Sequence, residues 1–210
     1  MGLNKTGLTS KSAENFIIDA GTVFTDFKFE SGEFTGTPLG ATRGGTQVNI
    51  ELTYRKVEVD GAYVMDVKGL NVLESATASV TVTLLELTAK NMARSMNAEL
   101  KAAEATDAPE GYQVITPKRY LTDSDYIENL AIVGIHSGTK KPVIFVMDNG
   151  LVKSPMNLAM EDNNEAGLEQ QITANADYAQ LAKDEFPWRI YYPGEATSGT
   201  GENEGTGGGE

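Results

Sequence analysis

Strict alternation of apolar and polar residues marks two long segments as β-strands. From Gln47 to Tyr54, and again from Ser75 to Leu84, every second residue is apolar. Because successive side chains of a strand point to opposite faces, each segment predicts a strand with one apolar and one polar face. The apolar positions are Val48, Ile50, Leu52 and Tyr54 in the first segment and Ala76, Ala78, Val80, Val82 and Leu84 in the second.

Further strands are predicted in the second half of the chain. Leu168–Tyr178 alternates in the same way. Leu130–Ile135 and Val143–Met147 are continuous apolar runs, which favour strands covered on both faces. Trp188–Tyr191 predicts a final short strand.

Turn signals separate several of these strands. Asp60–Gly61 and Asn149–Gly150 have the composition of two-residue hairpin turns, and Tyr63–Val67 is the expected return strand after the first. At Arg55–Lys56 the alternation slips by one residue, which predicts a β-bulge.

One segment has helical spacing instead. Apolar residues recur every three or four positions after Leu85, in a stretch rich in Ala, Met, Glu and Lys. This predicts one amphipathic helix from about Thr88 to Glu104. The following polar segment, Ala105–Tyr126, contains two prolines and is expected to be mostly loop. The elements together predict a mainly β protein, an antiparallel β-sandwich or partly open barrel with one flanking α-helix.

The two ends differ from the middle of the chain. Residues 1–15 are polar and are expected to form a flexible N-terminal arm, whereas residues 16–193 form the β domain. Residues 194–210, GEATSGTGENEGTGGGE, have no large apolar residue and predict a disordered tail. Met1–Lys11 lacks the apolar core of a signal peptide, so folding in a cytosol is expected.

Composition narrows the possible chemistry. Among 210 residues there is no cysteine, which removes disulfides, thiol catalysis and thiolate metal sites. Thirty acidic residues oppose seventeen basic ones, giving a net charge of −13. Tight binding to nucleic acid needs clustered Lys and Arg, so this balance disfavours it.

No catalytic or metal constellation is visible. His136 is the only histidine, and a hydrogen-bonded residue at the end of a strand explains it better than a catalytic dyad. The glycine-rich segments Gly40–Gly45 and Gly138–Lys141 lack the remainder of a phosphate loop and are interpreted as turns.

Two acidic segments are also explained without a ligand. Asp162–Gly167 resembles the start of a calcium loop, but its closing position is Thr173 in place of a carboxylate, so a solvated loop is expected. Asp123 and Asp125 are interpreted as helix-capping or solvated residues. No metal, cofactor or enzymatic activity is therefore predicted.

A series of short motifs carries a family resemblance. In chain order they are Ile17–Gly21 (IIDAG), Leu39–Gly45 (LGATRGG), Val57–Gly61 (VEVDG), Val67–Gly69 (VKG), Leu85–Asn91 (LELTAKN) and Phe186–Pro193 (FPWRIYYP). In their order and spacing, which cover most of Phe16–Pro193, the chain resembles the major tail tube proteins of long-tailed, siphovirus-like bacteriophages.

The resemblance implies a structural virion protein of the phage tail tube, assembled in the host cytoplasm. Such proteins form hexameric rings that stack into a non-contractile tube, and the inner sheets of neighbours join in one continuous barrel. Loops and the N-terminal arm reach the next ring. The tube encloses the tape-measure protein and later conducts DNA during ejection. Implied partners are further copies of the chain, the tape-measure protein, and the tail terminator and distal tail proteins, with no specific DNA binding and no membrane insertion.

Elementary geometry agrees with such a tube. Open sheet edges invite association and can be closed by identical neighbours. Six subunits with four strands each would give a wall of ~24 strands. With ~4.8 Å strand spacing and ~40° tilt, its backbone diameter would be ~48 Å. A polar, acidic lining would let DNA slide without being held.

Three polar rows are candidates for this lining. They are Asn49, Glu51 and Thr53; Thr77, Ser79, Thr81 and Thr83; and Glu169, Gln171 and Asp177. The outer, solvent-facing side of a sheet explains each row equally well.

Candidate contacts between rings lie in two expected loops, Phe34–Thr46 and Ala105–Tyr126. The residues singled out are Thr37, Leu39, Arg43, Tyr112, Lys118, Arg119 and Tyr120. A mobile surface loop without a partner is the alternative for each.

Two other functions compete with the tail tube. One is a different self-assembling β-protein, such as a capsid decoration or a fibre subunit. The other is a carbohydrate-binding β-sandwich, which requires exposed aromatic residues grouped on one face. Tyr112, Tyr120 and Tyr126 are the candidates for that group, and packing of these tyrosines on the domain edge explains them as well.

Overall fold

The computed structural model describes residues 6–61, 65–104, 106, 108–160 and 162–194. The first five residues of the predicted arm, and residues 195–210 of the predicted tail, lie outside the described part. The strands are β1 (Ile17–Glu30), β2 (Glu33–Pro38), β3 (Thr42–Lys56), β4 (Asn71–Leu84), β5 (Ala98–Ala102), β6 (Gln113–Pro117), β7 (Ile127–His136), β8 (Pro142–Val152), β9 (Leu158–Ala159), β10 (Gly167–Thr173) and β11 (Trp188–Tyr191). The helices are α1 (Ala89–Ser95) and α2 (Tyr178–Ala182), with short 3-10 turns at Ser12–Asn15 and Asp123–Asp125.

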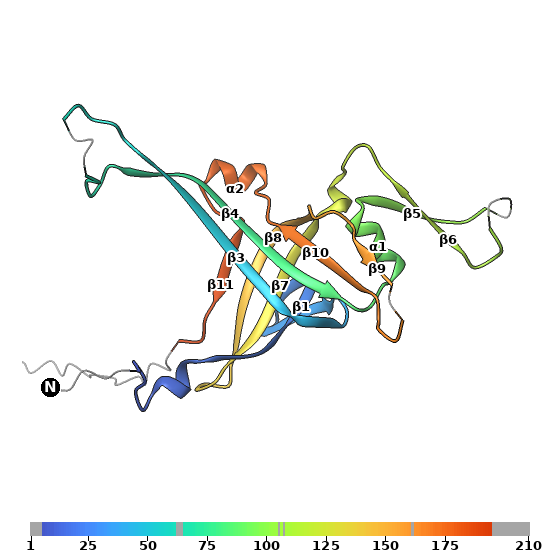
Figure 1. Ribbon diagram of the computed structural model, residues 1–210, viewed down its shortest axis with the longest axis horizontal. Helices are drawn as coiled ribbons and strands as arrows, with labels where there is room; N and C mark the ends of the chain where they lie inside the picture. The colour runs from blue at the N-terminus through green and yellow to red at the C-terminus, as the bar shows by residue number, and fades with distance from the viewer. Residues whose placement is uncertain (1–5, 62–64, 105, 107, 161, 195–210) are drawn as a thin grey trace, which may run out of the picture.

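The strands form a β-sandwich with a flanking helix, as predicted. Hydrogen bonding follows the order β2-β1-β7-β8-β10-β4-β3, and every neighbouring pair is antiparallel. Along one side of β8, the first half pairs with β11 and the last two residues pair with β10. We call β2-β1-β7-β8-β11 sheet A and β3-β4-β10-β9 sheet B; the two sheets diverge at the end of β8 (Figure 1).

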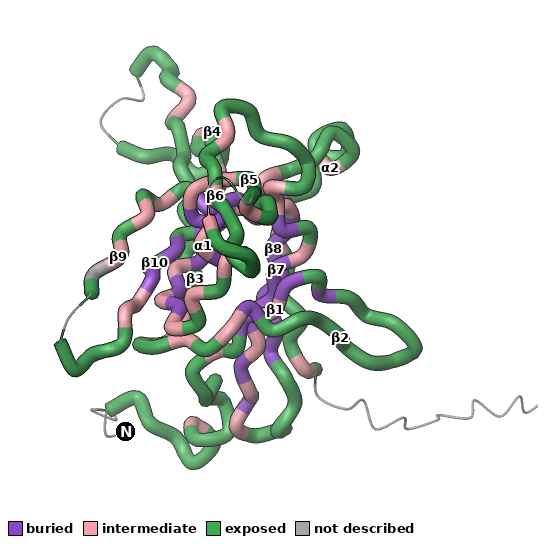
Figure 2. Tube along the Cα trace, turned by 90° about the vertical axis from the view of Figure 1, so that its right-hand side faces the viewer, coloured by how far each residue is buried: buried purple, intermediate pink, exposed green. Residues whose placement is uncertain are grey.

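The main core lies between the two sheets. Val80, Leu84 and Ile172 of sheet B pack with Leu130 and Met147 of sheet A, and all five are buried. A smaller cluster lies on the other face of sheet A and comprises Phe27, Ala131, Ile144 and Val146. Strands β7 and β8 are therefore covered on both faces, which confirms the prediction from their continuous apolar runs (Figure 2).

The β3–β4 hairpin extends well beyond the core and forms a projecting arm (Figure 1). This hairpin has two register shifts, and the one on the arm lies between Thr53 and Tyr54, with Glu74 as the extra residue on β4. It comes a little before the predicted slip at Arg55–Lys56. Asp60–Gly61 is a turn, but the predicted two-residue hairpin was wrong because the last pair of the ladder joins Lys56 to Asn71. The predicted return strand was wrong in its described part, residues 65–67, because pairing resumes only at Asn71.

Helix α1 begins as predicted but is shorter. The Thr88 side chain accepts a hydrogen bond from the Asn91 backbone N–H at 3.2 Å and caps the helix. The helix ends at Ser95, Asn97 adopts a left-handed φ of 49°, and the chain continues as β5. Strand β5 pairs with β6, which lies within the predicted loop 105–126. The predicted extension of the helix to Glu104 was wrong because residues 98–102 pair with β6 and are therefore held as a strand.

Three other predictions were corrected in the same way. Asn149–Gly150 continues strand β8 instead of forming a turn, with a left-handed φ of 48° at Asn149. Gly44 and Gly45 lie in strand β3, where their positive φ values of 81° and 82° accompany a register shift. The strand expected to reach Tyr178 ends at Thr173, and α2 begins after Asp177. The described helices are too short to span a membrane.

Candidate assembly surfaces

The three predicted polar rows meet on one face of sheet B. In the β3–β4 ladder, Asn49 lies opposite Ser79 and Glu51 lies opposite Thr77. Directly opposite residues share a face, so these two rows are continuous. The β10–β4 ladder adds the third row to the same face by pairing Gln171 with Thr81 and Glu169 with Thr83. We call this the polar face: Asn49, Glu51, Thr53, Thr77, Ser79, Thr81, Thr83, Glu169 and Gln171.

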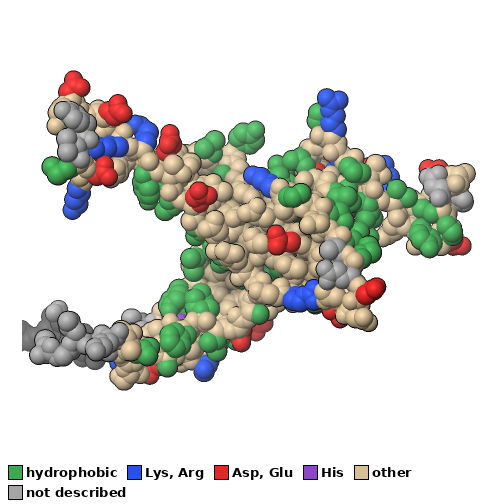
Figure 3. Space-filling model, viewed as in Figure 1, with side chains coloured by type: hydrophobic (Ala, Val, Ile, Leu, Met, Phe, Trp, Pro, Cys, Tyr) green, Lys and Arg blue, Asp and Glu red, His purple; other side chains and the backbone are tan. Residues whose placement is uncertain are grey.

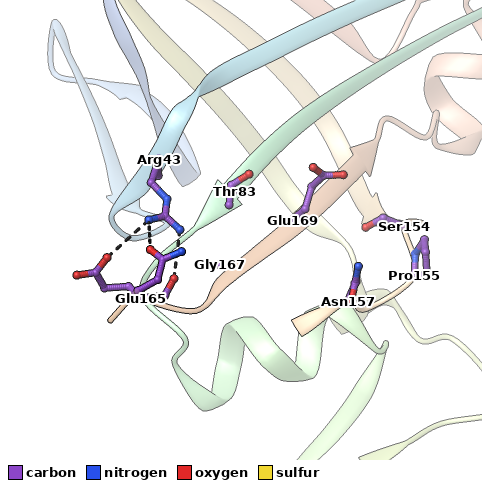
Figure 4. Close-up of a pocket in the computed structure, with 9 residues that line it drawn as sticks. Arg43, Thr83, Ser154, Pro155, Asn157, Glu165, Gly167 and Glu169 are labelled. Carbon is purple, nitrogen blue, oxygen red and sulfur yellow. Dashed lines mark hydrogen bonds and ion pairs between the residues drawn. The ribbon is translucent and has the colours of Figure 1, made fainter. Parts of the chain in front are cut away.

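The polar face carries acidic charge. Glu51 and Glu169 are its charged residues, and both are exposed. Arg43 lies at the end of the face, opposite Thr83, but its guanidinium is 3.6 Å from the Glu165 carboxylate. The same guanidinium donates to the Glu165 backbone carbonyl at 3.1 Å, so its charge is compensated locally (Figure 4).

One residue of the predicted rows lies elsewhere. The Asp177 carboxylate accepts a hydrogen bond from the Gln180 backbone N–H at 2.7 Å and caps α2. Its placement on a polar strand row was wrong because the strand ends four residues earlier. Within a single subunit, Ser79 is buried and Thr81 and Thr83 are half-buried, whereas the other members of the polar face are exposed.

Strand β3 exposes its apolar row. Val48, Ile50, Leu52 and Tyr54 have exposed fractions of 37, 39, 46 and 59%. The opposing row of β4 is buried near the core, at Ala78 and Val80. Strand β3 is also the last strand of the sheet order, and from Gln47 to Lys56 no described strand pairs with its outer edge, which we call the free edge. Figure 3 shows hydrophobic side chains along this arm. A long edge strand with an exposed apolar face is an association surface.

The opposite edge of sheet B is built differently. Residues 151–159 border β10, first as the end of β8 and then as the two-residue strand β9. Pro155 lies between these two short pairings. Together with Arg43 and Glu169, this segment lines an open pocket of about 420 Å³ (Figure 4).

The first predicted contact loop is mostly strand. Phe34–Pro38 lies in β2, and β3 begins at Thr42. Leu39 has an exposed fraction of 5% and its backbone N–H donates to the Val23 carbonyl, so its assignment as a ring contact was wrong. Thr37 pairs with Thr25 in the β1–β2 ladder. Arg43 remains exposed on β3.

The second predicted contact loop exposes Tyr112 and Tyr120. Tyr112 lies at the β5–β6 hairpin, and the Arg119 guanidinium lies over the Tyr120 ring, 5.4 Å from its centroid. Lys118 forms an ion pair with Asp125. Tyr126 lies apart, in a groove beside α2, and in the described part of the chain no ring contact joins it to the other two tyrosines.

A different aromatic group was missed by the sequence analysis. Phe34 of β2 contacts Phe27 and Phe29 of β1 and Tyr191 of β11. The signal was present in the segment FESGEF, Phe29–Phe34. The turn at Ser31–Gly32 brings the two phenylalanines opposite one another, as the pairing of Phe29 with Phe34 shows.

Two smaller predictions are confirmed. His136 ends β7, is buried, and its Nδ1 accepts from the Thr139 backbone N–H at 3.2 Å. Asp125 completes a capping box with Thr122. Burial raises the pKa of Asp125, but the hydrogen bonds from Lys118 and Thr122 outweigh burial and hold this pKa below its ordinary value.

Comparison with known proteins gives distant structural likenesses only. No protein-family model matches the chain. No curated protein sequence matches it. The tail of an empty gene transfer agent particle with C6 symmetry shares 15% identity at a TM-score of 0.39, covering 75% of this chain and 92% of that chain. The virion of a native gene transfer agent shares 14% identity at a TM-score of 0.38, with the same coverages. An anti-feeding prophage baseplate shares 10% identity at a TM-score of 0.40, covering 84 and 95%. TM-scores this low do not establish a shared fold.

Proposed function

We propose that this protein is a structural virion protein whose copies form stacked hexameric rings and thereby a non-contractile phage tail tube. The observation that carries the proposal is strand β3, which combines a free edge with an exposed apolar row. Native proteins usually block such an edge when it has no partner. Pairing with identical neighbours removes both the free edge and the apolar exposure.

The strand directions of sheet B suit a closed ring. A cyclic ring keeps the direction of every strand relative to its axis. In sheet B the direction alternates from β3 to β4, then to β10 and then to residues 151–159. Because the number of strands is even, the first strand, β3, and the last, segment 151–159, run in opposite directions. The β3 edge of one copy therefore lies antiparallel to segment 151–159 of the next copy. Sheet B can therefore continue around a ring without a parallel joint.

The polar face supplies the chemistry expected of a channel wall. In a ring joined through sheet B, one face of this sheet turns toward the axis, and the other packs on the main core. The face free of the core is the polar face, with Glu51 and Glu169 exposed on it. The nine residues that define the polar face include no lysine or arginine, so they would give phosphates nothing to hold. In this role the tube would enclose the tape-measure protein and conduct DNA during ejection. These two roles, and the number of six subunits in each ring, come from the family resemblance.

Electron microscopy of the purified protein tests assembly. Concentrated protein viewed in negative stain should show rings or hollow tubes. Leu52→Lys, which places a charge in the exposed apolar row, should abolish them, whereas Leu181→Lys on the exposed face of α2 should not. A wild-type protein that stays monomeric at high concentration would overturn the proposal.

Engineered cross-linking tests the ring joint itself. Because the chain has no cysteine, a variant with Ile50→Cys and Ser154→Cys has only these two thiols. The two positions lie on opposite edges of sheet B, so disulfides should form between copies. Oxidation should give a ladder ending at the hexamer, and each single-cysteine variant should give dimers at most. If the variant forms rings in the microscope but gives only monomers after oxidation, β3 and segment 151–159 do not meet between copies.

A further inference from the structure

A pocket of about 320 Å³ lies on the face of sheet A that is turned away from the main core. It is formed by the end of the β1–β2 hairpin, by β11 and by Asn129 of β7, none of which belongs to sheet B. Its wall combines aromatic rings with charged side chains. The volume is at the low end of small-molecule sites, and the open sides admit a ligand longer than the pocket.

The aromatic part of the wall is ordered but exposed. The ring centroid of Phe34 lies 5.0 Å from that of Phe29 and 5.8 Å from that of Tyr191. On its other side Phe34 stacks on the buried ring of Phe27 at 5.5 Å. Phe29 nevertheless has an exposed fraction of 62%, and Phe34 and Tyr191 each have 42%. Rings that hold each other in place and still face solvent form a preorganised apolar surface.

The polar part of the wall is fixed by Asp148. The Arg189 Nη1 donates to both carboxylate oxygens of Asp148, at 2.9 and 2.8 Å, and Arg189 Nε donates to the Tyr191 hydroxyl at 3.0 Å. Gln180 donates a further hydrogen bond to the same carboxylate at 2.8 Å. Within the described residues Arg189 Nη2 has no hydrogen bond, so its N–H groups are held in place and available.

The charges around the pocket cancel. Lys28 and Arg189 contribute two positive charges, and Glu30 and Asp148 contribute two negative ones. In the part of the chain that the structure describes, neither Lys28 nor Glu30 has an ionic partner. Single-stranded nucleic acid requires a positive groove along its backbone, which is absent here. The pocket therefore suits a neutral ligand that has one apolar face and a rim of groups that both donate and accept hydrogen bonds.

We propose that this pocket binds a pyranose ring of a neutral saccharide. The C–H face of the sugar lies against Phe29 and Tyr191, and its hydroxyl groups accept from Arg189 and donate to Glu30. A proline-rich peptide would also use aromatic rings but offers mainly carbonyl acceptors, leaving Glu30 without a donor. The proposal does not depend on the tube, because the pocket uses no residue of sheet B.

Binding to arrayed glycans tests the proposal. The full chain, labelled with a fluorophore, should bind a subset of neutral saccharides on a glycan array. Calorimetry with the free sugar should give a dissociation constant of about 1 mM or below. Phe29→Ala should weaken this binding at least about tenfold, since it removes the most exposed ring. Glu30→Gln, which keeps the shape and removes the charge, should weaken it by a smaller factor.

The matched control is another exposed phenylalanine. Phe186 stacks on Trp188 outside the pocket and has an exposed fraction of 52%, so Phe186→Ala should bind like the wild type. Thermal melts should show that all variants are folded. Failure of every saccharide to bind, equal binding by Phe29→Ala, or preferential binding of a proline-rich peptide would each overturn the proposal. None of these results would affect ring or tube formation in the microscope.

Discussion

Glu51 of β3 and Thr77 of β4 lie directly opposite one another on the polar face of sheet B. No described cation pairs with Glu51, which remains exposed. This pairing places the polar rows of β3 and β4 on one face, which the sequence alone did not show. It also makes Glu51 the central residue for testing whether the polar face lines a channel.

Reversing the charge at Glu51 should make the tube bind duplex DNA. Glu51→Lys places one new cation per subunit on the proposed lining, so assembled tubes should bind a fluorescent duplex in co-sedimentation. Binding should weaken as the salt concentration is raised from about 50 to 200 mM, because counterion release drives it. The wild-type tube should bind no duplex.

The control for this prediction carries the same change elsewhere. Glu110→Lys, on the exposed loop of the β5–β6 hairpin, should leave duplex binding at the wild-type level. Equal binding by the two lysine variants would mean that position 51 has no special relation to the channel.

Two positions on the apolar face of the β3–β4 hairpin, one near the core and one on the projecting arm, should differ in their effect on monomer stability. Leu84 is fully buried, so Leu84→Ala should lower the free energy of unfolding by about 2 to 5 kcal/mol. Leu52 is nearly half exposed, and Leu52→Ala should change it by about 0.5 kcal/mol or less. Urea denaturation at dilute, monomeric concentration measures both. A large loss for Leu52→Ala would show that the row is packed within one chain.

Asp148 should stabilise the C-terminal segment. Its carboxylate accepts from Arg189 of β11 and from Gln180 of α2, so Asp148→Ala leaves both donors without their acceptor. We expect a loss of about 1 to 3 kcal/mol in the free energy of unfolding. The exposed Lys101–Glu99 pair is the comparison, because Lys101→Ala should cost less than about 1 kcal/mol. Similar losses for the two variants would contradict this.

Acid should remove the contribution of Asp125. Its pKa is lower in the folded chain than in the unfolded chain, so the stabilisation is fully present above the unfolded pKa of about 4. It is lost as the pH falls through the folded value, where the native carboxylate takes up its proton. The wild type should therefore exceed Asp125→Asn in stability at pH 6, and the difference should shrink by pH 3. Lys118→Met should reduce the same pH-dependent difference, which urea titrations at both pH values would measure.

Regular patterns within single strands could be predicted from sequence. The alternation of Val48 to Tyr54 and of Ala76 to Leu84 gave β3 and β4, and the continuous run at Val143–Met147 gave a strand buried on both faces. Trp188–Tyr191 was predicted with the bounds that the structure has. These elements depend on the period of the side chains, which is a local property.

Features that depend on distant partners could not be predicted. Leu100 fits a helical spacing, yet it pairs with Ile115, because residues 113–117 form a strand that pairs with residues 98–102 along their whole length. Asn149–Gly150 has the composition of a turn, but β7 continues alongside it. That the apolar row of β3 is exposed follows from the length of the arm beyond the core, which alternation alone does not show.

The orientation of sheet B in assembled tubes tests the central claim most directly. A cryo-EM reconstruction of the tubes, at a resolution that separates strands, would locate Glu51, Thr77 and Glu169. We predict that all three face the bore and that the β3 edge of each subunit pairs with segment 151–159 of its neighbour. A reconstruction in which the polar face turns outward, or in which the bore is lined by lysine and arginine, would contradict the claim.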